Sequence, residues 1–116
     1  MFSVDIMDIN IEQLEEITII ELSGELDSIS APDVQREIMP LLRTESQILL
    51  DMSAVSYMSS AGLRVLLLLY RAIDAAVGDI IITGLRPAVQ DVMEITGFLE
   101  FFRTATSREE GLQALG

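Results

Sequence analysis

The hydrophobic pattern of the N-terminal part of the chain predicts two strands. Apolar residues occupy one parity of the segment 2–9 with polar residues between them, which is typical of a half-exposed strand. The segment 14–22 is rich in isoleucine and predicts a second strand, which Gly24 is expected to end. A short turn near residues 11–13 would allow the two strands to pair antiparallel.

The rest of the chain alternates between helical spacing and short, continuous apolar runs. Apolar side chains that recur every three or four residues indicate one face of a helix, whereas a short unbroken apolar run is typical of a strand covered on both faces. Helices are predicted to begin at Pro32, to run over 61–76, to begin at Pro87 and to follow Ser107. Strands are predicted at 47–52, at 80–82 and, as an aromatic last strand, at 98–102.

The resulting order of elements, β-β-α-β-α-β-α-β-α, predicts an α/β fold. Strands that alternate with helices favour a mixed, mostly parallel sheet packed with helices, to which the first hairpin adds an antiparallel edge. The sequence contains no Pro/Gly/Ser-rich linker and no internal repeat, so we interpret residues 1–116 as a single domain.

The composition excludes most catalytic chemistry. Cysteine, histidine and lysine are absent, and all seven basic residues are arginines. The chain therefore has no thiolate or imidazole metal ligand, no histidine for a serine hydrolase, and no lysine for a Schiff base or a P-loop. We predict a protein that is not an enzyme and that uses no metal or cofactor.

The net charge of −12 limits the choice of partners. Such a surface repels nucleic-acid phosphates and anionic lipid, so we expect no nucleic acid and no membrane among the partners. A partner with a basic or mixed face would complement this negative charge. The charge could equally serve only to keep the chain soluble. The longest apolar run, Val65–Tyr70, is much shorter than the roughly 20 residues of a membrane span. Residues 1–10 contain no basic leader, and a cytoplasmic location is expected.

Two adjacent serines, Ser59 and Ser60, lie between a predicted buried strand and the predicted helix 61–76. A serine in this position is most often an N-cap, whose hydroxyl accepts a hydrogen bond from a backbone N–H of the helix. The alternative is phosphorylation, which adds about −1.5 to −2 charges at pH 7 and changes the surface without changing the fold. The sequence pattern leaves both interpretations open.

The segment 48–63, ILLDMSAVSYMSSAGL, closely resembles the signature of the STAS-domain anti-sigma factor antagonists. In that family a buried strand ends in an aspartate, and a run of Asp, Ser, a small residue, Gly and Leu opens the next helix. The segments 24–27, 84–87 and 96–98 resemble further landmarks of the same family, so that the similarity covers nearly the whole chain.

The resemblance implies a STAS-like single domain that acts by partner switching. Ser60 aligns with the phosphorylated serine of the family. An anti-sigma factor that is also a serine kinase would phosphorylate it, a type-C serine phosphatase would restore it, and only the unphosphorylated form would bind the anti-sigma factor and free a sigma factor. We expect a monomer or a weak dimer. The expected partner-binding residues are Gly24, Glu25, Asp27, Tyr57, Met58, Ser59, Ala61 and Gly62.

The chain departs from the family at Ser59, where relatives usually have an aspartate. The loss of a carboxylate beside Ser60 should ease phosphorylation electrostatically, and Ser59 itself becomes a second candidate acceptor. Two other functions remain as alternatives. One is a module that senses a nucleotide or small molecule, and the other is a scaffold subunit of a signalling assembly.

Overall fold

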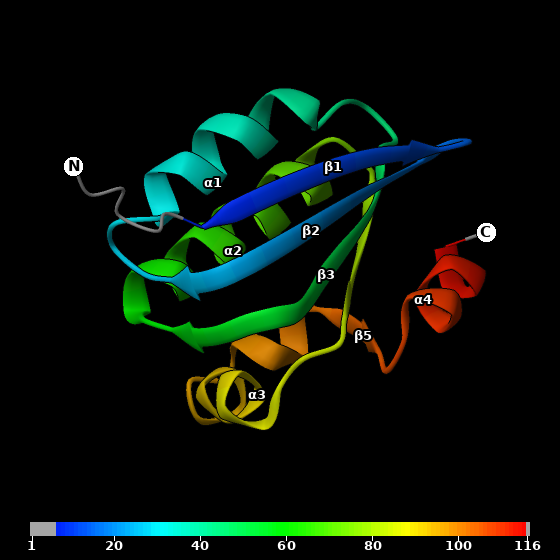
Figure 1. Ribbon diagram of the computed structural model, residues 1–116. Coiled ribbons are helices and arrows are strands. Elements are labelled where there is room, and N and C mark those ends of the chain that lie inside the picture. The colour runs from blue at the N-terminus through cyan, green and yellow to red at the C-terminus, as the bar shows by residue number, and fades with distance from the viewer. Residues whose placement is uncertain (1–6, 116) are drawn as a thin grey trace.

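A computed structural model describes residues 7–115 as five strands, four α-helices and two short 3-10 helices (Figure 1). The strands are β1 (Asp8–Leu14), β2 (Ile17–Leu26), β3 (Gln47–Met58), β4 (Asp79–Thr83) and β5 (Arg103–Ala105). The α-helices are α1 (Ala31–Ile38), α2 (Ser60–Ala75), α3 (Pro87–Ile95) and α4 (Arg108–Leu115). The 3-10 helices are η1 (Met39–Leu41) and η2 (Phe98–Phe101). The predicted order of strands and α-helices is confirmed.

The strands form one sheet in the order β1-β2-β3-β4-β5. β1 pairs antiparallel with β2, and the other three pairs are parallel. The sheet is therefore mixed and mostly parallel with an antiparallel edge, as the sequence predicts. Each parallel neighbour is reached through a helical crossover, because parallel strands cannot be joined by a tight turn.

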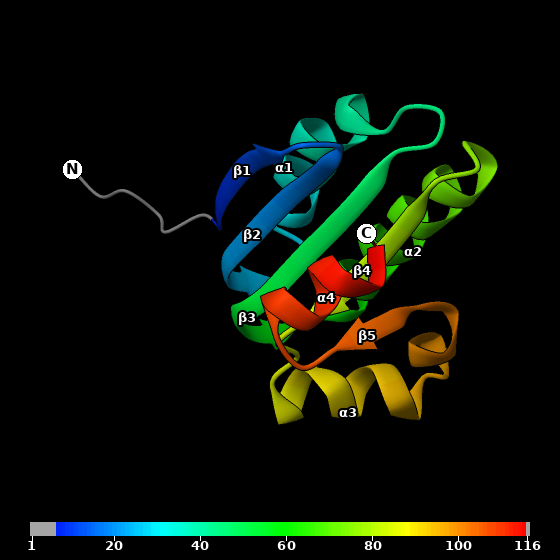
Figure 2. The same ribbon diagram turned by 90° about the vertical axis from the view of Figure 1, so that its right-hand side faces the viewer.

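The two faces of the sheet carry two separate apolar clusters. α1 and α2 lie on one face, and α4 crosses the other (Figures 1 and 2). The larger cluster lies under α1 and α2 and includes Ile20, Leu22, Leu50, Ile82, Val34 and Leu66. The smaller cluster lies under α4 and consists of Ile19, Leu49, Ile81, Ala105 and Leu115. Because successive strand residues point to opposite faces, the unbroken apolar runs of β3 and β4 supply both clusters.

The first hairpin differs from the prediction in its position along the chain. β1 ends at Leu14, and the turn is made by Glu15 and Glu16, with Glu15 at a φ of 55°. The turn predicted near 11–13 is wrong, because the strand continues through this segment and Ile11 pairs with Ile20. The part of the predicted strand at 2–6 lies outside the described residues.

Two strand ends were also predicted too early. β2 continues past Gly24 to Leu26, and Gly24 has a φ of 123° beside a shift in the register of β2 against β3. β3 continues past Asp51 to Met58, since Val55 and Met58 are buried and extend its apolar face. In both strands, a single glycine or polar residue interrupts the apolar sequence pattern, but the strand itself continues.

The predicted aromatic strand at 98–102 is wrong. Residues 98–101 form the 3-10 helix η2, and the strand β5 follows at Arg103–Ala105. Phe98 and Phe101 are three residues apart, which puts them on the same side of a 3-10 helix. The ring of Phe101 lies 5.6 Å from that of Tyr70 on α2 and 6.3 Å from that of Phe98, measured between centroids.

Candidate functional site

Ser59 caps the N-terminus of α2. Its backbone is extended, with φ −92° and ψ 178°, and its hydroxyl accepts a hydrogen bond from the Gly62 N–H at 3.4 Å. Its own N–H donates to the carbonyl oxygen of Leu26 at 2.9 Å, which ties the start of α2 to the end of β2. The half-buried Ser59 therefore has the N-cap role that the sequence pattern predicts for a serine in this position.

Ser60 is the first residue of α2, and it is exposed. Its hydroxyl makes no hydrogen bond with any residue in the range 7–115. The two adjacent serines thus differ in their surroundings, because one hydroxyl is used by the helix cap and the other faces solvent.

The loop between β2 and α1 lies beside these serines and is held by Asp27 and Ser30. One carboxylate oxygen of Asp27 accepts hydrogen bonds from the N–H groups of Ile29 and Ser30, at 2.9 and 3.1 Å. The Ser30 hydroxyl is buried, donates to the Glu25 carbonyl oxygen at 2.7 Å and accepts from the Asp27 N–H at 3.0 Å. Sequence analysis missed Ser30, although aspartate and serine are both residue types that favour turns.

Gly62 allows the two segments to approach one another. A Cβ at this position would lie 2.5 Å from the carbonyl oxygen of Leu26 and 2.9 Å from Cγ of Met58. Leu26 and Met58 are register partners at the ends of β2 and β3, so both strands end directly beneath the first turn of α2. Glycine is therefore needed here for space, and the close approach puts the start of α2 against Leu26, the residue that precedes the Asp27 loop.

The predicted partner-binding residues divide into a surface group and a supporting group. Glu25 is exposed and Tyr57 is 52% exposed, and the two are register partners near the ends of β2 and β3. Gly24, Asp27, Ser59 and Ala61 are half-buried. Met58 is only 3% exposed and Gly62 is buried, so these two support the surface from below and offer it no side chain. Ile29, which the sequence analysis did not select, is 65% exposed in the same loop.

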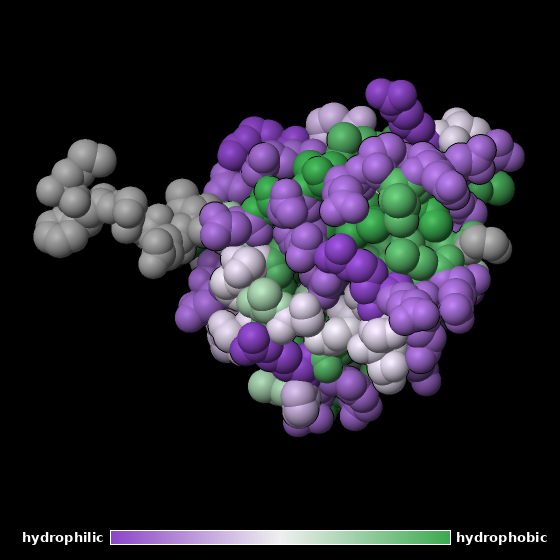
Figure 3. Space-filling view, turned by 45° about the vertical axis from the view of Figure 1, so that its right-hand side comes forward, coloured by the Kyte–Doolittle hydropathy of each residue, from purple (hydrophilic) through white to green (hydrophobic). Residues whose placement is uncertain are grey.

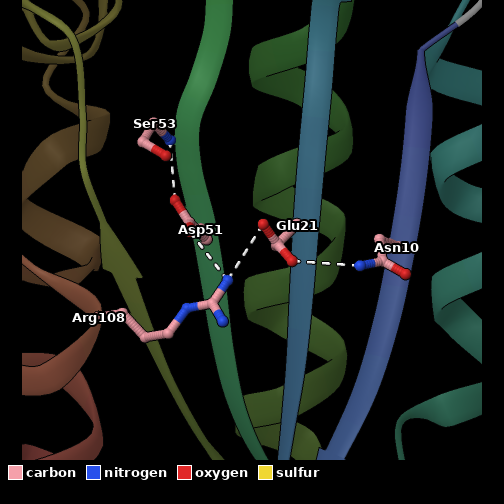
Figure 4. Close-up of polar contacts among 5 residues, drawn as sticks. All are labelled: Asn10, Glu21, Asp51, Ser53 and Arg108. Atoms are coloured by element: carbon pink, nitrogen blue, oxygen red, sulfur yellow. Dashed lines mark hydrogen bonds and ion pairs between the residues drawn. The ribbon is translucent and has the colours of Figure 1, made fainter.

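A second polar cluster joins α4 to the opposite face of the sheet (Figure 4). Nη2 of Arg108 lies 3.1 Å from a carboxylate oxygen of Glu21 and 3.2 Å from one of Asp51. Glu21 also accepts a hydrogen bond from Asn10 at 3.2 Å, and the Ser53 N–H donates to Asp51 at 2.9 Å. The cluster thus connects β1, β2, β3 and α4.

The ionisation of Asp51 reflects these contacts. Burial raises the pKa of this carboxyl, but hydrogen bonds from Ser53 and Arg108 and the charge of Arg108 outweigh burial, so that the pKa lies below its ordinary value. Asp51 is therefore an ionised, paired carboxylate and has no environment suited to a general acid. We interpret the cluster as an attachment of α4 to the sheet.

The side of the molecule that carries α4 has a mixed surface. Figure 3 shows hydrophilic residues over much of this side, interrupted by patches of apolar residues. Among residues 7–115, no three or more aspartate and glutamate side chains are grouped so as to hold a metal ion. In the same range, no helix is both long enough and apolar enough to span a membrane.

Comparison with known proteins identifies the family. The family model described as STAS domain matches residues 8–111. The Bordetella bronchiseptica protein BtrV, whose assigned role is that of an anti-sigma factor antagonist, is 33% identical over 109 residues, or 93% of this chain and 94% of BtrV. An anti-sigma factor antagonist from Mycobacterium paratuberculosis has a similar crystal structure, with a TM-score of 0.86, 22% identity and coverage of 99% and 98% of the two chains. The Bacillus cell fate determinant SpoIIAA in its phosphorylated form gives a TM-score of 0.72 at 22% identity, with coverage of 94% of this chain and 100% of SpoIIAA.

Proposed function

Because this chain belongs to the STAS-domain family, we propose that it is an anti-sigma factor antagonist whose partner binding is switched off by phosphorylation of Ser60. The observation that carries the proposal is the different use of the two serine hydroxyls. Ser59 is engaged in the helix cap, while Ser60 is exposed at the first position of α2.

In the unphosphorylated state, the neutral Ser60 hydroxyl lies within a mixed polar and apolar surface. Tyr57 and Ile29 supply exposed apolar area, and Glu25 and Asp27 supply acidic groups. An anti-sigma factor with an apolar contact area and basic groups complements this surface. Its capture by this chain would release the sigma factor that it otherwise holds.

Phosphorylation makes the same surface strongly anionic. A serine kinase, which we take to be the anti-sigma factor itself, transfers the γ-phosphoryl group of ATP to Oγ of Ser60, with loss of the hydroxyl proton and release of ADP. The product carries about −1.5 to −2 charges at pH 7. Burying such a group in an interface shaped for a neutral hydroxyl leaves it poorly solvated, which disfavours binding. A type-C serine phosphatase reverses the change by hydrolysis of the phosphoester to serine and inorganic phosphate.

Ser60 is a better acceptor than Ser59 for a structural reason. A phosphate on Ser59 would have to fit a half-buried site against Leu26, at a residue whose hydroxyl already accepts the Gly62 N–H. A phosphate on Ser60 extends into solvent, and no hydrogen bond among the described residues is lost. The fold of SpoIIAA is known in a phosphorylated form, so a protein of this architecture tolerates the modification.

The proposal is tested with the serine kinases of the organism that encodes this chain. We expect one of them to phosphorylate the native chain and Ser59→Ala, and to leave Ser60→Ala unmodified, as mapped by mass spectrometry. In pull-downs with the same kinase, Ser60→Ala should bind as native, and Ser60→Asp at least about ten-fold more weakly, a loss of roughly 1.4 kcal/mol. Phosphorylation of Ser60→Ala, or equal binding of both Ser60 variants, would contradict the switch.

A further inference from the structure

The seven arginines of this acidic chain differ in their contacts. Arg36 and Arg103 pair with Asp33 and Asp79, Arg108 pairs with Glu21 and Asp51, and Arg86 donates to the Ser53 carbonyl oxygen. Within residues 7–115, the guanidinium groups of Arg43, Arg64 and Arg71 have no such partner. Two of these three, Arg64 and Arg71, lie on α2, the helix that begins with Ser60.

Arg64 lies one turn after Ser60 on the same exposed side of α2. Four residues of an α-helix turn through about 400°, so the two side chains are about 40° apart around the helix axis. Helical side chains lean toward the N-terminus, which directs the long side chain of Arg64 back toward Ser60. An anion followed by a cation four residues later is the favourable orientation for such a pair.

No carboxylate competes for Arg64 from the neighbouring helix. Arg64 lies at a shallow groove of about 260 Å³ between α1 and α2, and the residues that line this groove with it are uncharged: Ser28, Ala31, Pro32, Gln35, Ala61, Val65 and Leu68. On α1, Asp33 is paired with Arg36, and Glu37 does not line the groove. In the adjoining loop, Asp27 accepts N–H groups of its own turn.

We propose that Arg64 binds the phosphate of phosphorylated Ser60 through an i,i+4 ion pair. This inference rests on the proposed function, which makes Ser60 the acceptor. A guanidinium presents parallel N–H donors that match two phosphate oxygens, and the charge-assisted bonds are stronger than neutral ones. Phosphorylation therefore has two effects on the surface of this chain that binds the partner. It adds negative charge at Ser60, and it engages the guanidinium of Arg64, which is then no longer available to an acidic group of the partner.

The test uses the full chain with phosphoserine genetically encoded at position 60, and it measures the second pKa of the phosphate by ³¹P NMR titration. Pairing with Arg64 favours the dianion and lowers that pKa. Arg64→Gln should therefore raise it by about 0.3 unit or more, the shift that corresponds to a helix pair worth about 0.4 kcal/mol. Arg64→Lys, which keeps the charge without the planar fork, should give a smaller rise.

Arg71→Gln is the matched control, because it removes the same charge from the same helix at a position remote from Ser60. It should shift the phosphate pKa by less than about 0.1 unit at 0.15 M salt, where charges more than about 8 Å apart are screened. Equal pKa values in the native chain and Arg64→Gln, or equal shifts in Arg64→Gln and Arg71→Gln, would overturn the pairing. Encoded phosphoserine needs no kinase, so these outcomes bear on Arg64 alone, whereas the absence of kinase modification at Ser60 contradicts only the proposed function.

Discussion

Replacing Gly62 by alanine tests the contact that places the start of α2 against the end of β2. The new Cβ would lie 2.5 Å from the Leu26 carbonyl oxygen and 2.9 Å from Cγ of both Leu26 and Met58. Ordinary carbon–oxygen contacts are about 3.3 Å or longer, so the first turn of α2 has to move by roughly 0.8 Å. The oxygen that is crowded is also the acceptor of the Ser59 N–H, so the same movement strains that hydrogen bond.

The expected cost combines opposing effects. Alanine is favoured over glycine in a helix by about 0.5–1 kcal/mol. Inserting a methyl group into a tightly packed position costs about 1–3 kcal/mol, and a weakened backbone hydrogen bond adds up to about 1 kcal/mol. Gly62→Ala should therefore lower the free energy of unfolding by about 2 kcal/mol, the middle of the range of about 0–3.5 kcal/mol that these contributions span.

Urea unfolding followed by circular dichroism measures this difference as a shift of the midpoint at unchanged slope. Gly97→Ala is the contrasting variant, because nothing lies within 4 Å of its added Cβ but its φ is 79°. It should cost about 1–2 kcal/mol from backbone conformation alone. If Gly62→Ala were as stable as the native chain or more stable, the close approach of α2 to Leu26 would be refuted.

Two further predictions concern the cap and the α4 cluster. Ser59→Ala should lower stability by about 0.5–1 kcal/mol in thermal or urea unfolding, while Ser59→Asp should retain the cap; equal loss in both variants would argue against capping by the side chain. Asp51→Asn should lower stability by about 1.5–3 kcal/mol at pH 7, because it removes the charge from the hydrogen bonds with Ser53 and Arg108. Since the folded pKa of Asp51 is depressed, its contribution is complete above the ordinary value of 3.8 and is lost as the pH falls through the folded pKa. The difference between Asp51→Asn and the native chain should therefore shrink below pH 3.8, and a constant difference down to pH 2 would contradict the assignment.

Periodicity was sufficient to predict the order of elements and the type of sheet. The unbroken apolar runs of β3 and β4 indicate strands covered on both faces, and both faces are indeed covered, by α2 and by α4. Strand ends were harder to predict because they depend on distant contacts. Asp51 is a polar residue at the end of an apolar run, yet β3 continues past it, and its partner Arg108 comes 57 residues later in the chain.

Only those features of the site that depend on neighbouring residues in the sequence could be predicted. A serine cap before α2 follows from the sequence, but which of the two serines caps depends on where the Gly62 N–H points. The exposure of Ile29 and the burial of Met58 likewise depend on how the ends of β2 and β3 pair beneath α2, and this packing has no local signature. Asp27 and Ser30 are residue types that favour a turn, but the burial of the Ser30 hydroxyl depends on the same packing.

The position of Arg108 has a consequence for shortened forms of the chain. Glu21 and Asp51 are register partners on adjacent strands, so the sheet places two carboxylates opposite one another. Like charges in this arrangement repel, and their common counter-ion, Arg108, comes 57 residues after Asp51 in the chain. Without Arg108 the repulsion would be uncompensated, at a cost of about 0.2–1 kcal/mol. Truncation before residue 108 would remove both this counter-ion and Leu115 of the smaller apolar cluster, so we expect a less stable sheet.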